Sequence, residues 1–190
     1  GYGYNADNTV PVFILSLPPD GDDYQVRYEN ARNMRAKDRE LRVLTGFSGR
    51  TQWELVTDCM CALSLPVKAM TITRNRKKVP APNSKYAEFL SVMVAVMYGI
   101  EFELPYMVIV EDDTTWGENL SYRARLDELV RYAKYSEMKR GGKGVVANLA
   151  NSGKGFFFTR KGMLDFVDRV YKVGMNSPID AFIKESVAVP

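Results

Sequence analysis

The chain contains no histidine among its 190 residues. This absence excludes serine–histidine–aspartate triads, zinc sites of the HExxH type and acid–base catalysis by imidazole. Any chemistry must therefore use carboxylates, lysine, tyrosine, serine or a bound metal ion.

Cysteine is scarce as well, since the chain has only Cys59 and Cys61, separated by one residue. A disulfide between them would be badly strained, and two thiols without histidine make a poor zinc site. We interpret them as two buried thiols on a helix. This favours a reducing compartment, and we expect a cytoplasmic location.

Long apolar runs and a strong net charge are also missing. No segment approaches the ~20 continuous apolar residues of a membrane span, and none resembles a secretory signal. The 26 basic and 23 acidic residues give a net charge of +3, so bulk charge does not indicate a nucleic-acid partner. The composition is globular, with 46% apolar residues. We expect a flexible, glycine-rich leader over residues 1–9 and one domain over residues 10–190.

Two kinds of apolar segment alternate along the chain. Short runs rich in β-branched and aromatic residues predict strands over residues 12–17, 43–45, 67–73, 107–110, 145–150 and 155–159. Longer segments predict helices over residues 24–42, 51–64, 86–98, 120–135 and 161–172, and a last helix after Pro178. Residues 73–84 are basic and contain prolines, which predicts a loop. The alternation predicts an α/β domain with a mixed, mostly parallel sheet and helices on both faces.

Three carboxylates, Glu111, Asp112 and Asp113, directly follow the predicted strand 107–110. Like charges this close repel one another unless a positive group lies among them. In open α/β sheets, ligands bind beyond the carboxyl ends of the strands, and carboxylate oxygens suit Mg²⁺ or Mn²⁺ that grips a diphosphate. The alternative is a solvated turn in which Asp113 caps the following segment. The triplet alone leaves both interpretations open.

Basic residues gather at two places that are candidates for phosphate binding. The first group consists of Arg74, Arg76, Lys77 and Lys78, and the second of Arg27, Arg32 and Arg35. The first group suits the phosphates of a nucleotide or an anionic acceptor, although a charge run is more often a solvated loop. It lacks the interleaved aromatic residues typical of nucleic-acid binding. The second group is mostly a solvated helix face, from which one arginine can still reach a nucleotide.

The segment MNSPIDAF, residues 175–182, begins the last predicted helix. Its Ser-Pro pair places Asp180 in the first turn, where the helix dipole favours a carboxylate. Asp180 then either caps the helix or, kept ionised near neutral pH, acts as a general base. The sequence does not favour one role over the other.

Three stretches, taken in order, resemble the nucleotide-sugar glycosyltransferases of the GT-A fold, most closely the family 25 type that includes lipopolysaccharide and collagen sugar transferases. VFILSLPPDGDD, followed by YENARNMR, is similar to the opening strand and arginine-bearing helix of that family. SKYAEFLSVMVAVMYGIEFELPYMVIVEDDTTW is similar to its helix, short loop and strand ending in an ExD motif. GFFFTRKGMLDFVDRVYKVGMNSPIDAFI resembles its closing strand, helix and P-[IV]-D element. Related transferases also occur in large viruses.

The resemblance implies a single-domain, Rossmann-related GT-A fold and a metal site at the acidic triplet. It implies that Asp113, with Glu111, holds Mn²⁺ or Mg²⁺. It also implies that the triplet as a whole, Asp112 included, binds the diphosphate of a nucleotide sugar.

The resemblance also implies roles for residues outside the triplet. The base and ribose of the nucleotide would contact the end of the first strand, at Ser16, Leu17 and Pro18. Asp180 would take the proton from the acceptor hydroxyl. Apart from the resemblance, the mechanism leads us to expect that Arg74, Arg76 or Lys77 lies on a mobile loop that closes over the donor.

The chain departs from the family pattern at two places, and both departures concern histidines that family members carry. Family members usually show a Ser-His pair where this chain has Ser91 followed by Val92, and many GT-A enzymes use a late histidine as a metal ligand. The expected activity is metal-dependent transfer of a sugar, with a UDP-sugar as the preferred donor, to a hydroxyl of a glycan or glycoprotein. The alternatives are an inactive transferase-like domain that binds a glycan or protein, and a metal-dependent nucleotide-sugar pyrophosphohydrolase. We expect no nucleic-acid partner and no membrane span in this segment, with room for further domains in a longer chain.

Overall fold

The computed structural model describes residues 10–17, 22–37, 41–113, 122–139, 141–149 and 155–186. Its strands are β1 (Val12–Ser16), β2 (Arg42–Thr45), β3 (Thr71–Arg74), β4 (Lys77–Pro80), β5 (Tyr106–Glu111), β6 (Val146–Asn148) and β7 (Gly155–Thr159). Its helices are α1 (Asp22–Lys37), α2 (Trp53–Ala62), α3 (Asn83–Glu101), α4 (Tyr122–Lys139), α5 (Arg160–Val173) and α6 (Ile179–Ser186). None of the helices in these ranges is long and apolar enough to cross a membrane. The predicted leader, residues 1–9, lies outside the described residues.

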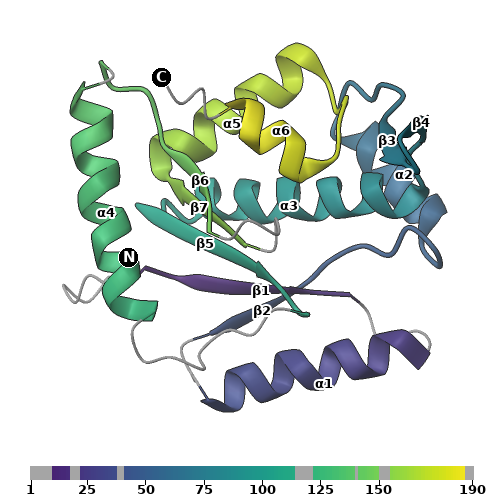
Figure 1. The fold of residues 1–190 in the computed structure, drawn as a ribbon, viewed down its shortest axis with the longest axis horizontal. Helices are drawn as coiled ribbons and strands as arrows, with labels where there is room; N and C mark the ends of the chain where they lie inside the picture. Colours follow the sequence, from purple (N-terminus) through teal and green to yellow (C-terminus); the bar gives the residue numbers. More distant parts are fainter. Residues whose placement is uncertain are drawn as a thin grey trace.

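Five strands form one sheet in the order β2-β1-β5-β7-β6 (Figure 1). Strand β1 pairs in parallel with both β2 and β5, whereas β7 runs antiparallel to β5 and β6. The predicted mixed sheet is thereby confirmed. It is less parallel than expected, because half of its pairings are antiparallel.

Helices cover both faces of this sheet, as the sequence predicted (Figure 1). Successive side chains of a strand point to opposite faces. In β1, Val12 and Ile14 therefore pack with α1 and α4, whereas Phe13 packs on the other face with α2, α3, α5 and α6. Strand β5 divides in the same way, with Val108 on the first face and Met107 on the second. Both faces of the central strands are buried, which explains why they read as continuous apolar runs.

Most predicted elements are present, with shifted ends. The strand at residues 155–159 has the predicted bounds, and the helix at residues 86–98 is extended at both ends to Asn83–Glu101. The helix predicted over residues 24–42 ends at Lys37, and Arg42 belongs instead to β2. The strand predicted from residue 67 begins at Thr71.

The predicted basic loop at residues 73–84 was wrong over residues 73–80, which form the end of β3, the turn and the second strand of a β-hairpin. Arg74 pairs with Lys77 across a two-residue turn, and the turn residues Asn75 and Arg76 have φ angles of 51° and 61°. Two-residue hairpin turns of this kind need positive φ at both central residues, and Asn-Gly is their usual sequence signal. Arginine rarely adopts this left-handed conformation, so the turn gave no recognisable signal.

Candidate functional site

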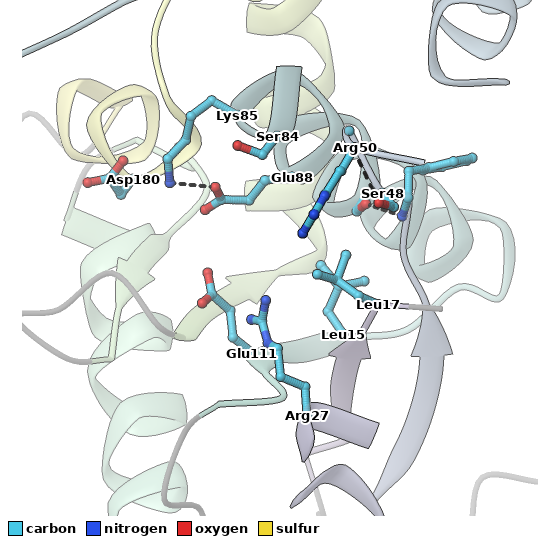
Figure 2. Close-up of a pocket in the computed structure, with 13 residues that line it drawn as sticks. Leu15, Leu17, Arg27, Ser48, Arg50, Ser84, Lys85, Glu88, Glu111 and Asp180 are labelled. Carbon is cyan, nitrogen blue, oxygen red and sulfur yellow. Dashed lines mark hydrogen bonds and ion pairs between the residues drawn. The ribbon is translucent and has the colours of Figure 1, made fainter. Parts of the chain in front are cut away.

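The order of the strands creates a crevice at the carboxyl ends of β1 and β5. From β1 the chain passes through α1 to β2 on one side, and it later returns as β5 on the other side of β1. Ligands of open α/β sheets bind at such a switch point. A pocket of about 430 Å³ opens there (Figure 2). It is lined by Leu15, Leu17, Arg27, Phe47, Ser48, Gly49, Arg50, Ser84, Lys85, Glu88, Ser91, Glu111 and Asp180.

The end of β5 separates the three carboxylates of the acidic triplet. Glu111 is the last residue of the strand and lines the pocket beside α3. Asp112 is 0% exposed and lies in the turn that follows, against α1. The side chain of Asp113 is 38% exposed. Three adjacent like charges thus occupy three different surroundings, which reduces the repulsion that their spacing implies.

An ion pair neutralises the buried member of the triplet. Arg27 Nε lies 2.7 Å from Asp112 Oδ1, and the backbone N–H of Leu17 donates to Asp112 Oδ2 at 3.1 Å. The side-chain amide of Asn30 donates to the backbone carbonyl of Asp112 at 2.5 Å. Arg27 Nη2 also lies 4.0 Å from Asp113 Oδ2. Asp112 therefore connects the end of β1, helix α1 and the end of β5.

Glu111 carries negative charge that its neighbours do not fully compensate. Burial, together with the nearby carboxylates of Glu88 and Asp113, raises the pKa of Glu111 from 4.5 to about 7, and Arg27 and Lys85 only partly offset this. Glu88 is itself paired, because Lys85 Nζ donates to its Oε2 at 2.6 Å (Figure 2). The pocket thus retains an excess of acidic groups around Glu111, and such an excess attracts a cation or a proton.

The loop between β2 and α2 forms the opposite wall of the pocket. A Cβ added at Gly49 would lie 2.4 Å from backbone atoms of Asn83 and Ser84, so only glycine permits this close approach to the start of α3. The Ser91 hydroxyl accepts the N–H of Phe47 at 2.8 Å and holds the same loop to α3. Figure 2 shows the side chain of Arg50 pointing from this loop into the pocket.

Helix α3 presents its first turn to the pocket. It begins at Asn83 without a side-chain cap, and Ser84 and Lys85 of its first turn line the cavity. The N-terminal end of a helix carries a partial positive charge and favours anions. Together with Arg50, this end of α3 gives one side of the pocket an affinity for anions, opposite the acidic side at Glu111.

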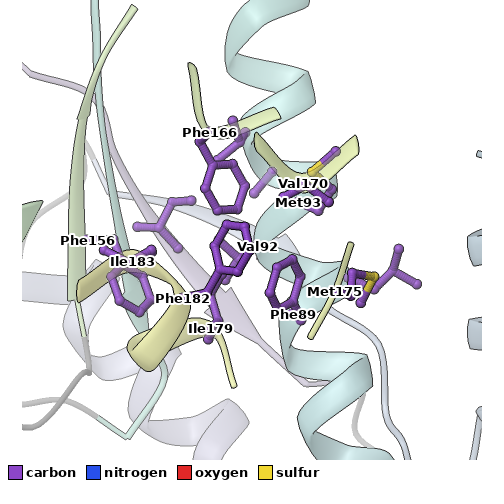
Figure 3. Close-up of a cluster of buried hydrophobic side chains, with 14 of the residues drawn as sticks. Phe89, Val92, Met93, Phe156, Phe166, Val170, Met175, Ile179, Phe182 and Ile183 are labelled. Carbon is purple, nitrogen blue, oxygen red and sulfur yellow. The ribbon is translucent and has the colours of Figure 1, made fainter. Parts of the chain in front are cut away.

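A buried aromatic cluster positions α6, and with it Asp180. Phe182 of α6 lies edge-on to Phe89 of α3 at 5.1 Å between ring centroids and to Phe166 of α5 at 5.7 Å (Figure 3). Ile179 and Ile183 are 0% exposed in the same core. Because these residues occupy the core side of the helix, Asp180 faces the pocket, where it contributes to the field around Lys85.

Several residues expected at the site do lie around this one pocket. Leu17, Glu111 and Asp180 line it. Asp112 is buried beside it and pairs with Arg27, which also lines the pocket. Asp113 follows directly and lies near enough to Glu111 to raise its pKa.

Three expected residues lie elsewhere or cannot be placed. Ser16 is buried, at 3% exposure, and is not among the lining residues. Pro18 lies outside the described residues. Arg74 is exposed in β3 and does not line the pocket.

The sequence analysis missed several lining residues, among them Arg50, Ser84, Lys85 and Glu88. Lys85 and Glu88 are three residues apart on α3, a spacing that is common in solvated helix pairs. The segment Ser48-Gly49-Arg50 before a helix was the one available signal, since small residues ahead of a helix often accompany anion binding.

The carboxylates at the pocket suit a divalent cation that takes most of its ligands from water and a bound substrate, and only one or two from the protein. The described residues contain no cluster of three or more acidic, cysteine or histidine side chains able to hold a metal. Glu111 and Asp113 lie near each other, and burial, followed by the charges of Glu88 and Asp113, raises the pKa of Glu111, so a cation there would favour its ionised form. Mg²⁺ binds through one or two carboxylates, with water and substrate phosphates as its other ligands. A cation at Glu111 and Asp113 fits that pattern.

Comparisons with known proteins leave the family open. No protein-family model matches the chain, and no curated protein has detectable similarity to it. The resemblance to the family 25 glycosyltransferases therefore rests on the three stretches quoted above.

Replacing Asp112 by asparagine tests the importance of the buried ion pair. Asp112→Asn keeps an acceptor for the Leu17 N–H but removes the charge that pairs with Arg27. The Arg27 side chain is 32% exposed and partly reaches water, so we expect a loss of about 1–3 kcal/mol in the free energy of unfolding. Asp113→Asn is the control, with an expected change within about 0.5 kcal/mol. Urea denaturation measures both, and equal small losses would show that the pair is not a structural constraint.

The raised pKa of Glu111 predicts a dependence of stability on pH. The folded state holds this proton more tightly than the unfolded state, whose pKa is near 4.5. The stabilising contribution is therefore complete below pH 4.5 and is lost as the pH rises through about 7. Glu111→Gln removes this titration. The melting temperature of the variant minus that of the native chain should therefore increase as the pH rises from 4.5 to about 7, and should stay constant above that pH. Glu101→Gln, an exposed position on α3, is the control. Parallel melting curves from pH 4 to 8.5 would contradict the assignment.

Proposed function

We propose that this chain is a metal-dependent glycosyltransferase that moves a sugar from a nucleotide-diphosphate sugar to a hydroxyl of a glycan or glycoprotein. The observation that carries the proposal is the composition of the switch-point pocket. The buried carboxylate of Glu111, whose pKa is raised, and the nearby carboxylate of Asp113 lie near a wall formed by Arg50 and the first turn of α3, and Asp180 lines the same cavity. A sugar diphosphate bound with a cation requires both kinds of surface.

Glu111 and Asp113 are the proposed ligands of Mn²⁺ or Mg²⁺. When bound, such a cation neutralises negative charge on a leaving diphosphate. Asp112 does not coordinate in this proposal, because its carboxylate already accepts the Leu17 N–H and pairs with Arg27. Its role is to hold the turn that presents Asp113.

Arg50 and the first turn of α3 are the proposed diphosphate-binding groups. The guanidinium of Arg50 carries a permanent charge and several donors, and it points into the pocket (Figure 2). This proposal replaces Arg74, the sequence-based candidate, because Arg74 does not line the cavity. Leu15 and Leu17 supply apolar surface at the end of β1, where a nucleotide base can pack.

Asp180 is the proposed base for the acceptor hydroxyl. It lies in the first turn of α6, and its side chain is close enough to Lys85 to contribute to the field there. It lines the same pocket as Glu111, so a sugar held by its diphosphate lies within reach of a group that accepts a proton. The buried face of α6 fixes this position.

Nucleotide binding tests the site itself. We expect UDP or GDP to bind in the presence of Mn²⁺ or Mg²⁺ by calorimetry, and Asp113→Ala to abolish the metal-dependent part. Arg50→Ala should weaken binding about tenfold, because a charge-assisted contact to phosphate is lost. Arg74→Ala, an arginine outside the pocket, is the matched control and should bind like the native chain. The proposal fails if the native protein binds no nucleoside diphosphate with either metal.

Catalysis tests the role of Asp180. Asp180→Asn should leave nucleotide binding intact and slow sugar transfer by about 10²–10⁴-fold, since a general base is lost. Asp168→Asn, an exposed position on α5, should not change the rate. UDP release from a UDP-sugar with acceptor glycans measures the transfer. Equal rates in the two variants would reduce Asp180 to a helix cap.

A further inference from the structure

The β3–β4 hairpin is the most strongly cationic element of the described chain. Its four basic side chains are all exposed: Arg74, Arg76, Lys77 and Lys78. Residues 59–87, which contain the hairpin, include six basic residues and no acidic residue. The whole chain carries a net charge of +3, so the remainder of the sequence is net acidic. Positive charge is therefore concentrated on one projecting element.

The hairpin contributes little to the hydrophobic core. It forms a two-stranded sheet of its own, separate from the five-stranded sheet. Within residues 71–80 every side chain is exposed except Ile72 and Val79, which are half-buried and directly opposite each other. A two-stranded hairpin of this kind is marginally stable by itself. Core packing thus does not explain its composition.

The charges of the hairpin are arranged unfavourably for the folded chain alone. Arg74 lies directly opposite Lys77, and like charges at opposed positions destabilise a strand pair. Arg76 adopts a left-handed backbone conformation, with φ of 61°, that residues other than glycine and asparagine rarely adopt. An anion held between the side chains of Arg74 and Lys77 would relieve the repulsion between them.

The hairpin lies next to the pocket. Strand β4 ends at Pro80, and α3, whose first turn lines the pocket, begins at Asn83. The base of the hairpin is held to α3, because the N–H of Met70 donates to the Tyr86 hydroxyl at 2.8 Å. Figure 1 shows the hairpin at the same end of the molecule as the start of α3 and the carboxyl ends of β1 and β5.

We propose that the β3–β4 hairpin binds an anionic glycan, one bearing carboxylate or sulfate groups, and holds it as the acceptor beside the pocket. The acceptor role rests on the proposed function, whereas the binding does not. The exposed groups of the hairpin are cations and the hydroxyls of Thr71 and Thr73, which match the acidic groups and hydroxyls of such a glycan. Residues 71–80 contain no aromatic residue on which a nucleic-acid base would stack, and no exposed large apolar residue that would enter a membrane.

Direct binding of acidic polysaccharides tests the proposal without any nucleotide. Heparin and chondroitin sulfate fragments should bind the native protein at low salt by calorimetry, and neutral dextran should not. The double variant Arg74→Glu, Lys77→Glu should weaken this binding by about tenfold or more, because two attractive contacts become repulsive. The control is Lys134→Glu, Lys139→Glu, which makes the same change of charge at exposed positions of α4 and should leave the affinity within about twofold. Circular dichroism verifies that each variant is folded.

Three results would overturn the proposal. The first is an equal loss of affinity in the hairpin variant and the α4 control, which would indicate a diffuse effect of net charge. The second is tighter binding of an RNA oligonucleotide or of anionic phospholipid vesicles, with the same dependence on the hairpin, which would assign the surface to another class of partner. The third is the absence of any binding to heparin and chondroitin sulfate.

The outcome is distinguishable from that of the proposed function. If UDP with Mn²⁺ binds and the acidic polysaccharides do not, the hairpin proposal fails and the transferase proposal stands. If the polysaccharides bind through the hairpin and no nucleoside diphosphate binds, the transferase proposal fails. The acceptor role of the hairpin then fails too, because it depends on that proposal, and only the binding of the polysaccharide remains. If both bind, acidic fragments should raise UDP release in the native protein more than in the hairpin variant, and equal release would overturn the acceptor role.

Discussion

The ion pair between Arg27 and Asp112 is the contact on which the candidate site depends. A fully buried carboxylate is costly unless it is paired and hydrogen-bonded, and Asp112 has both an arginine and a backbone N–H. These partners come from α1 and from the residue after β1, so neutralising one charge also fixes three segments relative to one another. Glu111, which lines the pocket, and Asp113 flank this pair along the chain, and neither takes part in the 2.7 Å contact.

The remainder of the site is built on the opposite face of the sheet. Helices α3 and α6 are held there by apolar side chains, above all by the rings of Phe89, Phe166 and Phe182 (Figure 3). This core places the first turns of both helices at the pocket. Close packing also shapes the pocket at Gly49, where the lack of a side chain allows the β2–α2 loop to approach the backbone of α3. Apolar packing thus surrounds a cavity in which six of the thirteen lining residues are charged.

Local sequence pattern was sufficient to predict the bounds of strands that are buried on both faces. It was insufficient where the conformation of a turn, or a contact with a residue distant in the sequence, determined the structure. The run Gly155–Thr159 has the predicted bounds, since five consecutive buried residues leave little ambiguity. The hairpin at Arg74 was missed, because its turn places arginine in a conformation that sequence rules assign to glycine or asparagine. Lys85 and Glu88 were missed for another reason: their spacing is that of an ordinary surface pair, and only the fold turns them toward Glu111.

By itself, the sequence determined the class of the fold, the cover of helices on both faces of the sheet and the position of three carboxylates after a buried strand. These follow from patterns of two to four residues, which local chemistry sets. Only the tertiary structure decided which carboxylate is neutralised, because Leu17 and Asp112 are 95 residues apart and meet only when β5 inserts beside β1. Strand order depends on the packing of the whole domain, and it brought Arg50 to the pocket and left Arg74 outside it.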